Sequence, residues 1–234
     1  MIVIALFLYA ESLLDAFDCA AATGSNSHAS GYNCVMGTIT ELLKQRYSVR
    51  NFQQKAVPAH VLQEILEAGR LSPSGGNEQP WRFYIVTDPA VITQIAAIAH
   101  HQNWIAQSPL LIVLCTVFVE EEKIGGEIQA HRYPEYTKAV ADIDPNLYRA
   151  LNQEEHQTKI AGTHMALAAL EHGVGSCWVS RFEVRRLADL LDVPQNVLPS
   201  EILVLGYSNR QHTQSPKKSL EEIAVFVRGV VPDC

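Results

Sequence analysis

The chain has 234 residues, of which 47% are hydrophobic and 18% are charged, and its formal net charge is -7. This composition is typical of a folded protein with a sizeable core and argues against a disordered chain. It also argues against a general nucleic-acid-binding protein, because such proteins carry an excess of basic residues.

The first 36 residues are expected to form a poorly structured extension. Residues 1–10 are apolar but too few to cross a bilayer. They lack the basic start of a secretory signal, although Ala20–Ala22 resembles a cleavage site. Residues 23–32 are rich in Gly, Ser, Asn and His, which is typical of a linker. We therefore expect an extension over residues 1–36, one domain over residues 37–234, and no association with a membrane.

Hydrophobic periodicity predicts helices and strands in the rest of the chain, without strict alternation between them. Thr38 and Glu41 have the spacing of a capping box, which predicts that a helix begins at this point. Further helices are expected over residues 58–68, 89–98, 158–170 and 184–191. Strands are expected over residues 83–86, 110–119, 174–179 and 201–206. These elements predict an α+β fold with three layers.

Three stretches carry more specific expectations. The apolar run at 110–119 does not alternate with polar residues, so it predicts a central strand covered on both faces. The span Glu120–Gln157 is polar and contains three tyrosines, which fits either a lid over a site or a surface insertion without function. The apolar tail at 223–231 follows a polar loop and needs a surface to cover it.

The stretch from Arg46 to Arg50 is the first candidate binding element. An extended backbone would send Arg46, Ser48 and Arg50 to one side, and a helical one would still put the two arginines on one face. Two guanidinium groups and a hydroxyl suit a phosphate-bearing ligand. The alternative is the solvated end of a surface helix, since exposed charges are common.

The familiar metal and nucleophile motifs are missing from the sequence. It contains no His-Glu-x-x-His, no Gly-x-Ser-x-Gly and no phosphate-binding Gly-rich loop before a helix, so no metal site is expected. The five cysteines include no Cys-x-x-Cys pair, which favours a reducing, cytoplasmic location, and Cys177 is expected to be a core thiol. The polar groups that remain are Ser74, Asn77, Ser180, Arg181, Lys217 and Lys218 together with the basic stretch. Such a set binds rather than reacts, as expected when a cofactor carries the chemistry.

From about residue 38 to residue 229 the chain resembles the nitroreductase family of flavin enzymes. The resemblance rests on four motifs in the expected order. They are Arg46-x-Ser48-x-Arg50, the loop from Pro73 to Trp81, the run Gly173-Val174-Gly175-Ser176-Cys177-Trp178, and Leu205-Gly206-Tyr207 followed by Lys217 to Glu222. It implies a central mixed, mainly antiparallel sheet flanked by helices.

The resemblance also implies FMN as cofactor and assigns the residues that bind it. Arg46, Ser48 and Lys217 would hold its phosphate and ribityl end, while Arg50 and Asn77 would lie at the pyrimidine edge of its ring. Ser74 would also bind the cofactor, and Val179, Ser180 and Arg181 would offer backbone donors toward the ring atoms N5 and O4. No side chain would be catalytic. Arg181 departs from the small residues of many members, so it would meet an anionic substrate or the nicotinamide phosphate, or else face solvent.

The activity implied is an FMN-dependent oxidoreductase. Hydride would pass from NADH or NADPH to the flavin and then to a nitroaromatic, quinone or similar acceptor, in ping-pong order. Alternatives are another flavin reaction on the same scaffold (dehalogenation, dehydrogenation or flavin fragmentation) and a flavin-binding module without turnover. Similar proteins are homodimers that bind FMN between their subunits, so a homodimer is expected here.

Overall fold

The computed structural model describes residues 38–117, 155–210 and 215–224. The extension predicted over residues 1–36 lies outside these ranges. So do residues 120–154 of the predicted lid or insertion and all but the first two residues of the apolar tail. In the part of the chain that the structure describes, no helix is both long and apolar enough to cross a membrane.

The centre of the fold is a sheet of four named strands, ordered β1-β2-β4-β3, in which every adjacent pair is antiparallel. The strands span Trp81–Val86 (β1), Leu110–Val117 (β2), Gly175–Val179 (β3) and Val197–Gly206 (β4). The predicted central position of the apolar run is confirmed, because β2 lies between β1 and β4 and is almost wholly buried. A parallel bridge between Ser48 and Ser176 extends the sheet beyond β3 and makes it mixed.

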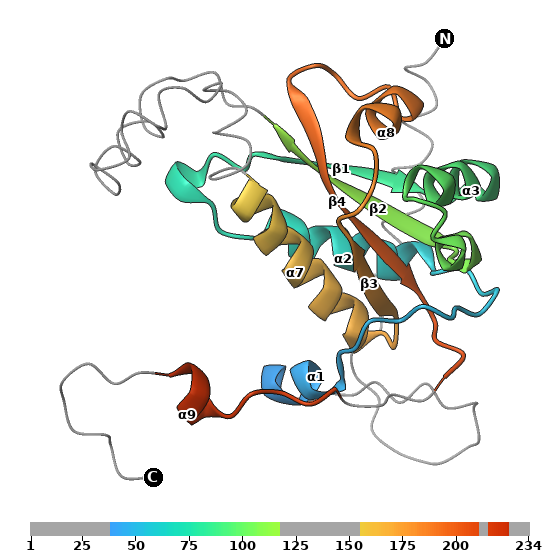
Figure 1. Ribbon diagram of the computed structural model, residues 1–234. Coiled ribbons are helices and arrows are strands. Elements are labelled where there is room, and N and C mark those ends of the chain that lie inside the picture. The colour runs from blue at the N-terminus through green and yellow to red at the C-terminus, as the bar shows by residue number, and fades with distance from the viewer. Residues whose placement is uncertain (1–37, 118–154, 211–214, 225–234) are drawn as a thin grey trace, which may run out of the picture. The chain divides into compact units, whose positions relative to one another are not determined.

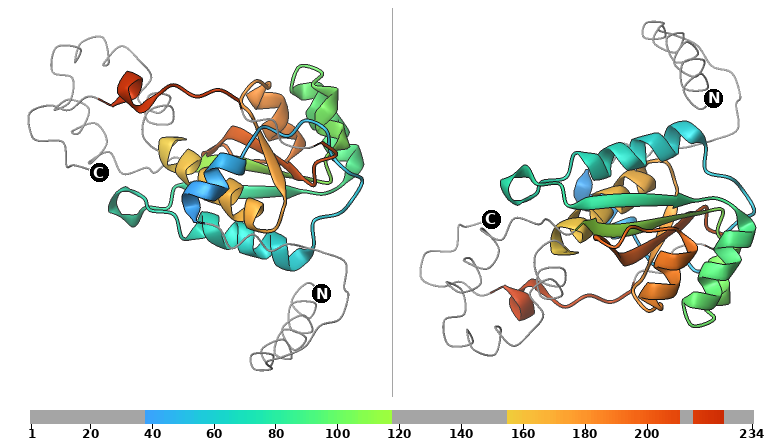
Figure 2. Two further views of the ribbon diagram at one scale, coloured as in Figure 1. Left: turned by 90° about the horizontal axis from the view of Figure 1, so that it is seen from below. Right: turned by 90° about the horizontal axis from the view of Figure 1, so that it is seen from above.

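Helices cover both faces of the sheet (Figures 1 and 2). The helices are α1 (Ile39–Gln45), α2 (Ala59–Arg70), α3 (Pro89–Ile98), α7 (Glu155–Glu171), α8 (Val184–Leu190) and α9 (Leu220–Ile223), with short 3-10 helices η2 (Gly75–Asn77) and η3 (Asn103–Gln107). One core cluster joins the sheet to α2 and α7, and the other joins the opposite face to α3, η3 and α8. The predicted three-layer α+β fold is therefore confirmed.

The predicted start of the first helix is confirmed at the level of its hydrogen bonds. The backbone N–H of Glu41 donates to the Thr38 hydroxyl, and the Glu41 carboxylate accepts from the Thr38 N–H at 2.8 Å. The helix ends at Gln45, and the next residue, Arg46, has an extended backbone (φ -66°, ψ 126°). The chain therefore leaves α1 as an extended segment at the point where the basic stretch begins.

Two element boundaries differ from the predictions by three residues or more. Helix α7 begins at Glu155, three residues before the apolar stripe, and Lys159 pairs with both Glu155 and the buried Glu201 at 3.1 Å. Strand β4 begins at Val197 rather than at Glu201, because its first residues pair with the end of β2 across a register shift at Cys115. A bulge of this kind accommodates Pro199, which lacks the N–H of a regular strand residue. Local sequence patterns do not report such long-range partners.

Candidate functional site

The basic stretch lies along the free edge of β3. The backbone N–H of Val49 donates to the Ser176 carbonyl at 3.0 Å, and Ser48 bridges Ser176. The close approach requires a glycine at position 175, since a Cβ there would lie only 2.5 Å from Cγ2 of Val49. The buried Val49 side chain thus anchors the stretch and leaves the neighbouring polar side chains at the surface.

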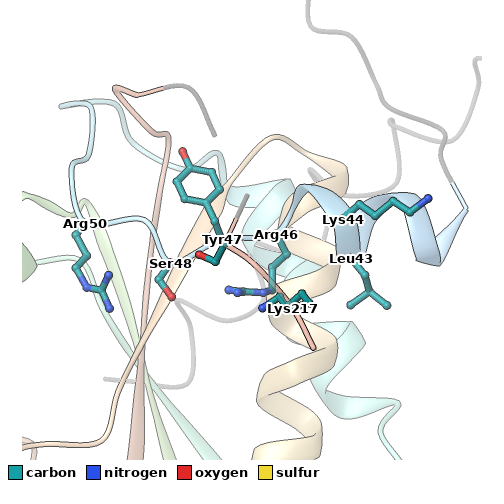
Figure 3. Close-up of a pocket in the computed structure, with 8 residues that line it drawn as sticks. Leu43, Lys44, Arg46, Tyr47, Ser48, Arg50 and Lys217 are labelled. Carbon is teal, nitrogen blue, oxygen red and sulfur yellow. The ribbon is translucent and has the colours of Figure 1, made fainter. Parts of the chain in front are cut away.

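The extended alternative for this stretch is the one that the structure adopts. Figure 3 shows the side chains of Arg46, Ser48 and Arg50 on one side of the backbone and that of Tyr47 on the other. The Tyr47 hydroxyl donates to the Ser208 hydroxyl at 2.7 Å and to the carbonyl of Arg210 at 3.0 Å. Tyr47 therefore fixes the back of the stretch, and the period-two prediction for the other three residues is confirmed.

A pocket of about 410 Å³ opens beside this stretch. The lining residues are Leu43, Lys44, Arg46, Tyr47, Ser48, Arg50, Ser215 and Lys217. Lys217 comes from the segment that follows β4 and lines this pocket together with Arg46 (Figure 3). The structure thus brings together four of the predicted site residues, Arg46, Ser48, Arg50 and Lys217, from two distant segments.

The pocket is electropositive. Among the described residues, no carboxylate lines it, and Arg46, Arg50 and Lys217 form no ion pair. Cations that converge without acidic partners repel one another and favour an anion between them. Arginine and lysine donors beside a hydroxyl fit a phosphate group in particular.

The thiol of Cys177 lies behind this set of donors. Burial raises its pKa, while the charge of Arg50, a hydrogen bond from Ser48 and the charge of Arg46 oppose that rise. The polar side chains of Arg46, Ser48 and Arg50 therefore all oppose the effect of burial on the pKa of this thiol. Cys177 is 1% exposed, so the prediction of a core thiol is confirmed.

Val179, Ser180 and Arg181 lie farther along the same edge. Val179 ends β3 and is buried, whereas Ser180 and Arg181 are exposed. The amide of Gln102 donates to the Arg181 carbonyl at 3.4 Å. These residues continue the line that starts with Arg46, so the edge of β3 forms one elongated element with Arg46 near its start and Arg181 at its far end.

Ser74 and Asn77 are not near this surface within one chain. They lie on the η2 loop, whose Gly75 N–H donates to the Gln157 side chain near the first turn of α7. The basic stretch lies beside Ser176, which follows the other end of α7. Since α7 has 17 residues, it separates the two groups by about 25 Å (Figure 1).

The η2 loop is nonetheless built as a constrained element. Gly76, Asn77 and Gln79 have φ values of 57°, 58° and 52°, a left-handed conformation that glycine adopts freely, that asparagine tolerates and that is unfavourable for glutamine. The Ser74 hydroxyl accepts from the Gln79 N–H at 2.9 Å and closes the loop. The loop therefore holds the exposed Asn77 side chain in a defined place, and one function of Ser74 is to shape it.

Sequence reasoning missed three residues that support the site. Tyr47 and Gln157 hold the two loops through the hydrogen bonds given above, and Trp104 contacts Arg50, with 5.8 Å from the guanidinium carbon to the ring centre. No local pattern predicts the contacts of Gln157 and Trp104, because each lies on a different element from the residue that it supports. A tyrosine between two arginines was the one available signal.

The model of the nitroreductase family matches residues 43–207 of the chain. A protein from Thermus thermophilus named NADH dehydrogenase is 27% identical, over 82% of this chain and 97% of its own length. An oxygen-insensitive NADPH nitroreductase from Helicobacter pylori is also 27% identical, over 76% of this chain and 91% of its own length. The crystal structure of a nitroreductase family protein from Streptococcus pneumoniae superposes with a TM-score of 0.66 at 19% identity, covering 81% of this chain and all of the other.

Proposed function

Because the chain belongs to the nitroreductase family, we propose that it is an FMN-dependent oxidoreductase. It would pass a hydride from NADH or NADPH to a nitroaromatic, quinone or similar acceptor. The same site would serve donor and acceptor in turn, which gives ping-pong kinetics. The names of the relatives, an NADH dehydrogenase and an NADPH nitroreductase, support a reduced nicotinamide as donor.

The observation that carries this proposal is the pocket beside the basic stretch, where, among the described residues, no carboxylate lies in the lining and Arg46, Arg50 and Lys217 form no ion pair. Arg46, Ser48 and Lys217 offer charged and neutral donors from two segments to one point (Figure 3). That set fits the phosphate of FMN, because a dianion between Arg46 and Lys217 satisfies donors that have no acidic partner among the described residues. These three residues would therefore bind the phosphate and ribityl end.

The elongated edge of β3 fits the ring of the cofactor beyond its phosphate. FMN would supply the hydride transfer, since its ring accepts a hydride from one molecule and passes it to another. Arg50 would lie at the pyrimidine edge, where its charge stabilises the negative charge that accompanies reduction. Val179, Ser180 and Arg181 would present backbone donors at the opposite edge. No side chain of this set is needed as an acid, base or nucleophile.

A second copy of the chain would complete the site. Ser74 and Asn77 cannot reach the Arg50 side of their own chain, because α7 lies between the two groups. In a symmetric dimer, the constrained η2 loop of one copy would meet the cationic edge of the other. Apolar side chains that a partner could cover are present on α1 and α7, where Ile39, Leu43 and Ile160 are 70%, 50% and 41% exposed.

Flavin titration followed by anaerobic reduction tests the proposal. Apo protein should bind FMN stoichiometrically, and NADH or NADPH should then bleach the flavin absorbance without oxygen. Reoxidation by a nitroaromatic or a quinone should restore the colour and close the cycle. A protein that takes up no FMN, or whose flavin neither nicotinamide reduces, would contradict the proposal.

Product analysis separates this activity from the other flavin reactions. Recovery of intact FMN after many turnovers supports hydride transfer to the acceptor, whereas loss of the flavin under oxygen would indicate fragmentation. Tight FMN binding without any steady-state turnover would indicate a binding module.

A further inference from the structure

We propose that Trp104 is a positioning residue that holds Arg50 ready at the flavin ring. Trp104 lies on η3, after the turn that leaves α3, and its ring faces the Arg50 guanidinium at 5.8 Å. This distance is within the range of cation–π attraction. The inference rests on the proposed function, because the role assigned to Arg50 comes from there.

The Trp104 ring is itself held in place by the core. It stacks on Phe52, with 6.4 Å between the ring centres and an angle of 28° between the planes. Phe52 is 2% exposed, bridges Ser208, and its carbonyl accepts from the Asn209 side chain at 2.7 Å. Because the half-buried Trp104 ring packs on this buried residue, its orientation toward Arg50 is fixed.

Arg50 depends on this contact because it has few others. In the part of the chain that the structure describes, its guanidinium has no carboxylate partner, and its side chain is exposed. A free arginine side chain loses much rotamer freedom when it becomes ordered at a ligand. The Trp104 ring restricts Arg50 beforehand, so less freedom remains to be lost when the flavin ring arrives.

The turn before Trp104 also contacts the opposite edge of the predicted ring site. The Gln102 amide donates to the carbonyls of Ala99 at 3.0 Å and of Arg181 at 3.4 Å. His100 and His101 have φ values of 55° and 57°, and consecutive left-handed residues other than glycine are unfavourable unless their surroundings fix them. The strained turn thus places Gln102 against the Arg181 backbone and Trp104 against the Arg50 side chain. These are the two groups expected at opposite edges of the flavin ring.

The test compares Trp104→Leu with Trp104→Phe, since leucine keeps an apolar side chain whereas phenylalanine also keeps an aromatic face. Trp104→Leu should weaken FMN and riboflavin binding by the same factor, about two- to fivefold, the strength of an exposed cation–π pair. It should also lower the flavin reduction potential, and Trp104→Phe should restore most of both values. In an Arg50→Ala background, Trp104→Leu should have no further effect.

A measurement without flavin checks the contact directly. In NMR spectra of the apo protein, the Arg50 side-chain protons should show an upfield ring-current shift that Trp104→Leu abolishes and Trp104→Phe retains. If Trp104→Leu weakened flavin binding equally in the wild-type and Arg50→Ala backgrounds, the role of Trp104 would be overturned. The same holds if Trp104→Leu left both the flavin affinity and the reduction potential unchanged. A wild-type protein that binds no flavin would overturn the proposed function as well, so the two failures are distinguishable.

Discussion

The backbone N–H of Val49 donates to the carbonyl of Ser176 at 3.0 Å and joins the basic stretch to the strand that follows α7. This bond, with the bridge between Ser48 and Ser176, places two segments from different parts of the chain side by side. The side chains of Arg46, Ser48 and Arg50 then project to one side of the backbone (Figure 3), and Lys217 lines the same pocket. The cationic pocket exists because of this junction.

Gly175→Ala should disturb the junction. The new Cβ would lie 2.5 Å from Val49 Cγ2, so Val49 and its neighbours must shift. We expect a loss of about 1–3 kcal/mol in the free energy of unfolding, as for other overpacked sites, together with weaker FMN binding. Urea unfolding and flavin fluorescence measure the two effects. Adding Val49→Ala should relieve the clash, and simple additivity of the two substitutions would contradict this explanation.

Lys217 and its neighbour Lys218 form a matched pair for testing the phosphate end. Lys217 lines the pocket, whereas Lys218 does not. Lys217→Ala should weaken FMN binding by about 10- to 100-fold, the value of a charged hydrogen bond, and leave riboflavin binding unchanged. Lys218→Ala should alter neither. Equal effects of Lys217→Ala on FMN and riboflavin would show that Lys217 does not contact the phosphate.

Complementation between two defective variants tests whether the site is shared between subunits. Arg46→Ala removes a cation from one half of the site, and Asn77→Gly removes the η2 side chain while tolerating its φ of 58°. Each variant alone should bind FMN weakly. After unfolding, mixing and refolding, half of the dimers should be mixed, and each should contain one intact site, so about a quarter of all sites should bind FMN normally. No recovery would mean that both halves come from one chain.

Lys159→Met should destabilise the fold through Glu201. The Glu201 side chain is 6% exposed, and its partner Lys159 Nζ lies 3.1 Å away. Removing the cation leaves a buried carboxylate without a charged partner, which should lower the free energy of unfolding by about 2–4 kcal/mol. The double variant Lys159→Met/Glu201→Leu should recover most of this loss in urea unfolding. Equal stability of the wild type and the Lys159→Met variant would show that the pair contributes nothing.

Cys115 should make the protein less stable in alkali. Burial raises the pKa of its thiol to about 12, whereas the pKa of a thiol in an unfolded chain is about 8.5. Between these values the unfolded chain loses a proton that the folded chain keeps, so the free energy of unfolding falls as pH rises, by up to about 1.4 kcal/mol per unit. Below pH 8 the thiol contributes no slope. Cys115→Ala should remove this part of the slope in urea unfolding between pH 9 and 11, and identical slopes would contradict the assignment.

The sequence predicted the layers of the fold and one half of the site. Apolar runs and hydrophobic periodicity located the named strands and most helices. They do so because the residues that a helix or strand buries are the apolar ones that form the pattern in the sequence. The spacing of Arg46, Ser48 and Arg50 implied a shared side for an extended backbone, but a helix was equally compatible with it. The ends of α7 and β4 were misplaced because Lys159–Glu201 and the pairing of Val197 connect residues that are distant in sequence.

By itself, then, the sequence determined which residue types could bind an anion and in what alternation they follow one another. Tertiary structure decided that the stretch is extended, that Lys217 joins it, and that Ser74 and Asn77 lie at the far end of α7. It also placed Trp104 against Arg50. The physical reason is that side-chain alternation is a local property of the backbone, whereas the meeting of distant segments depends on the packing of the whole core.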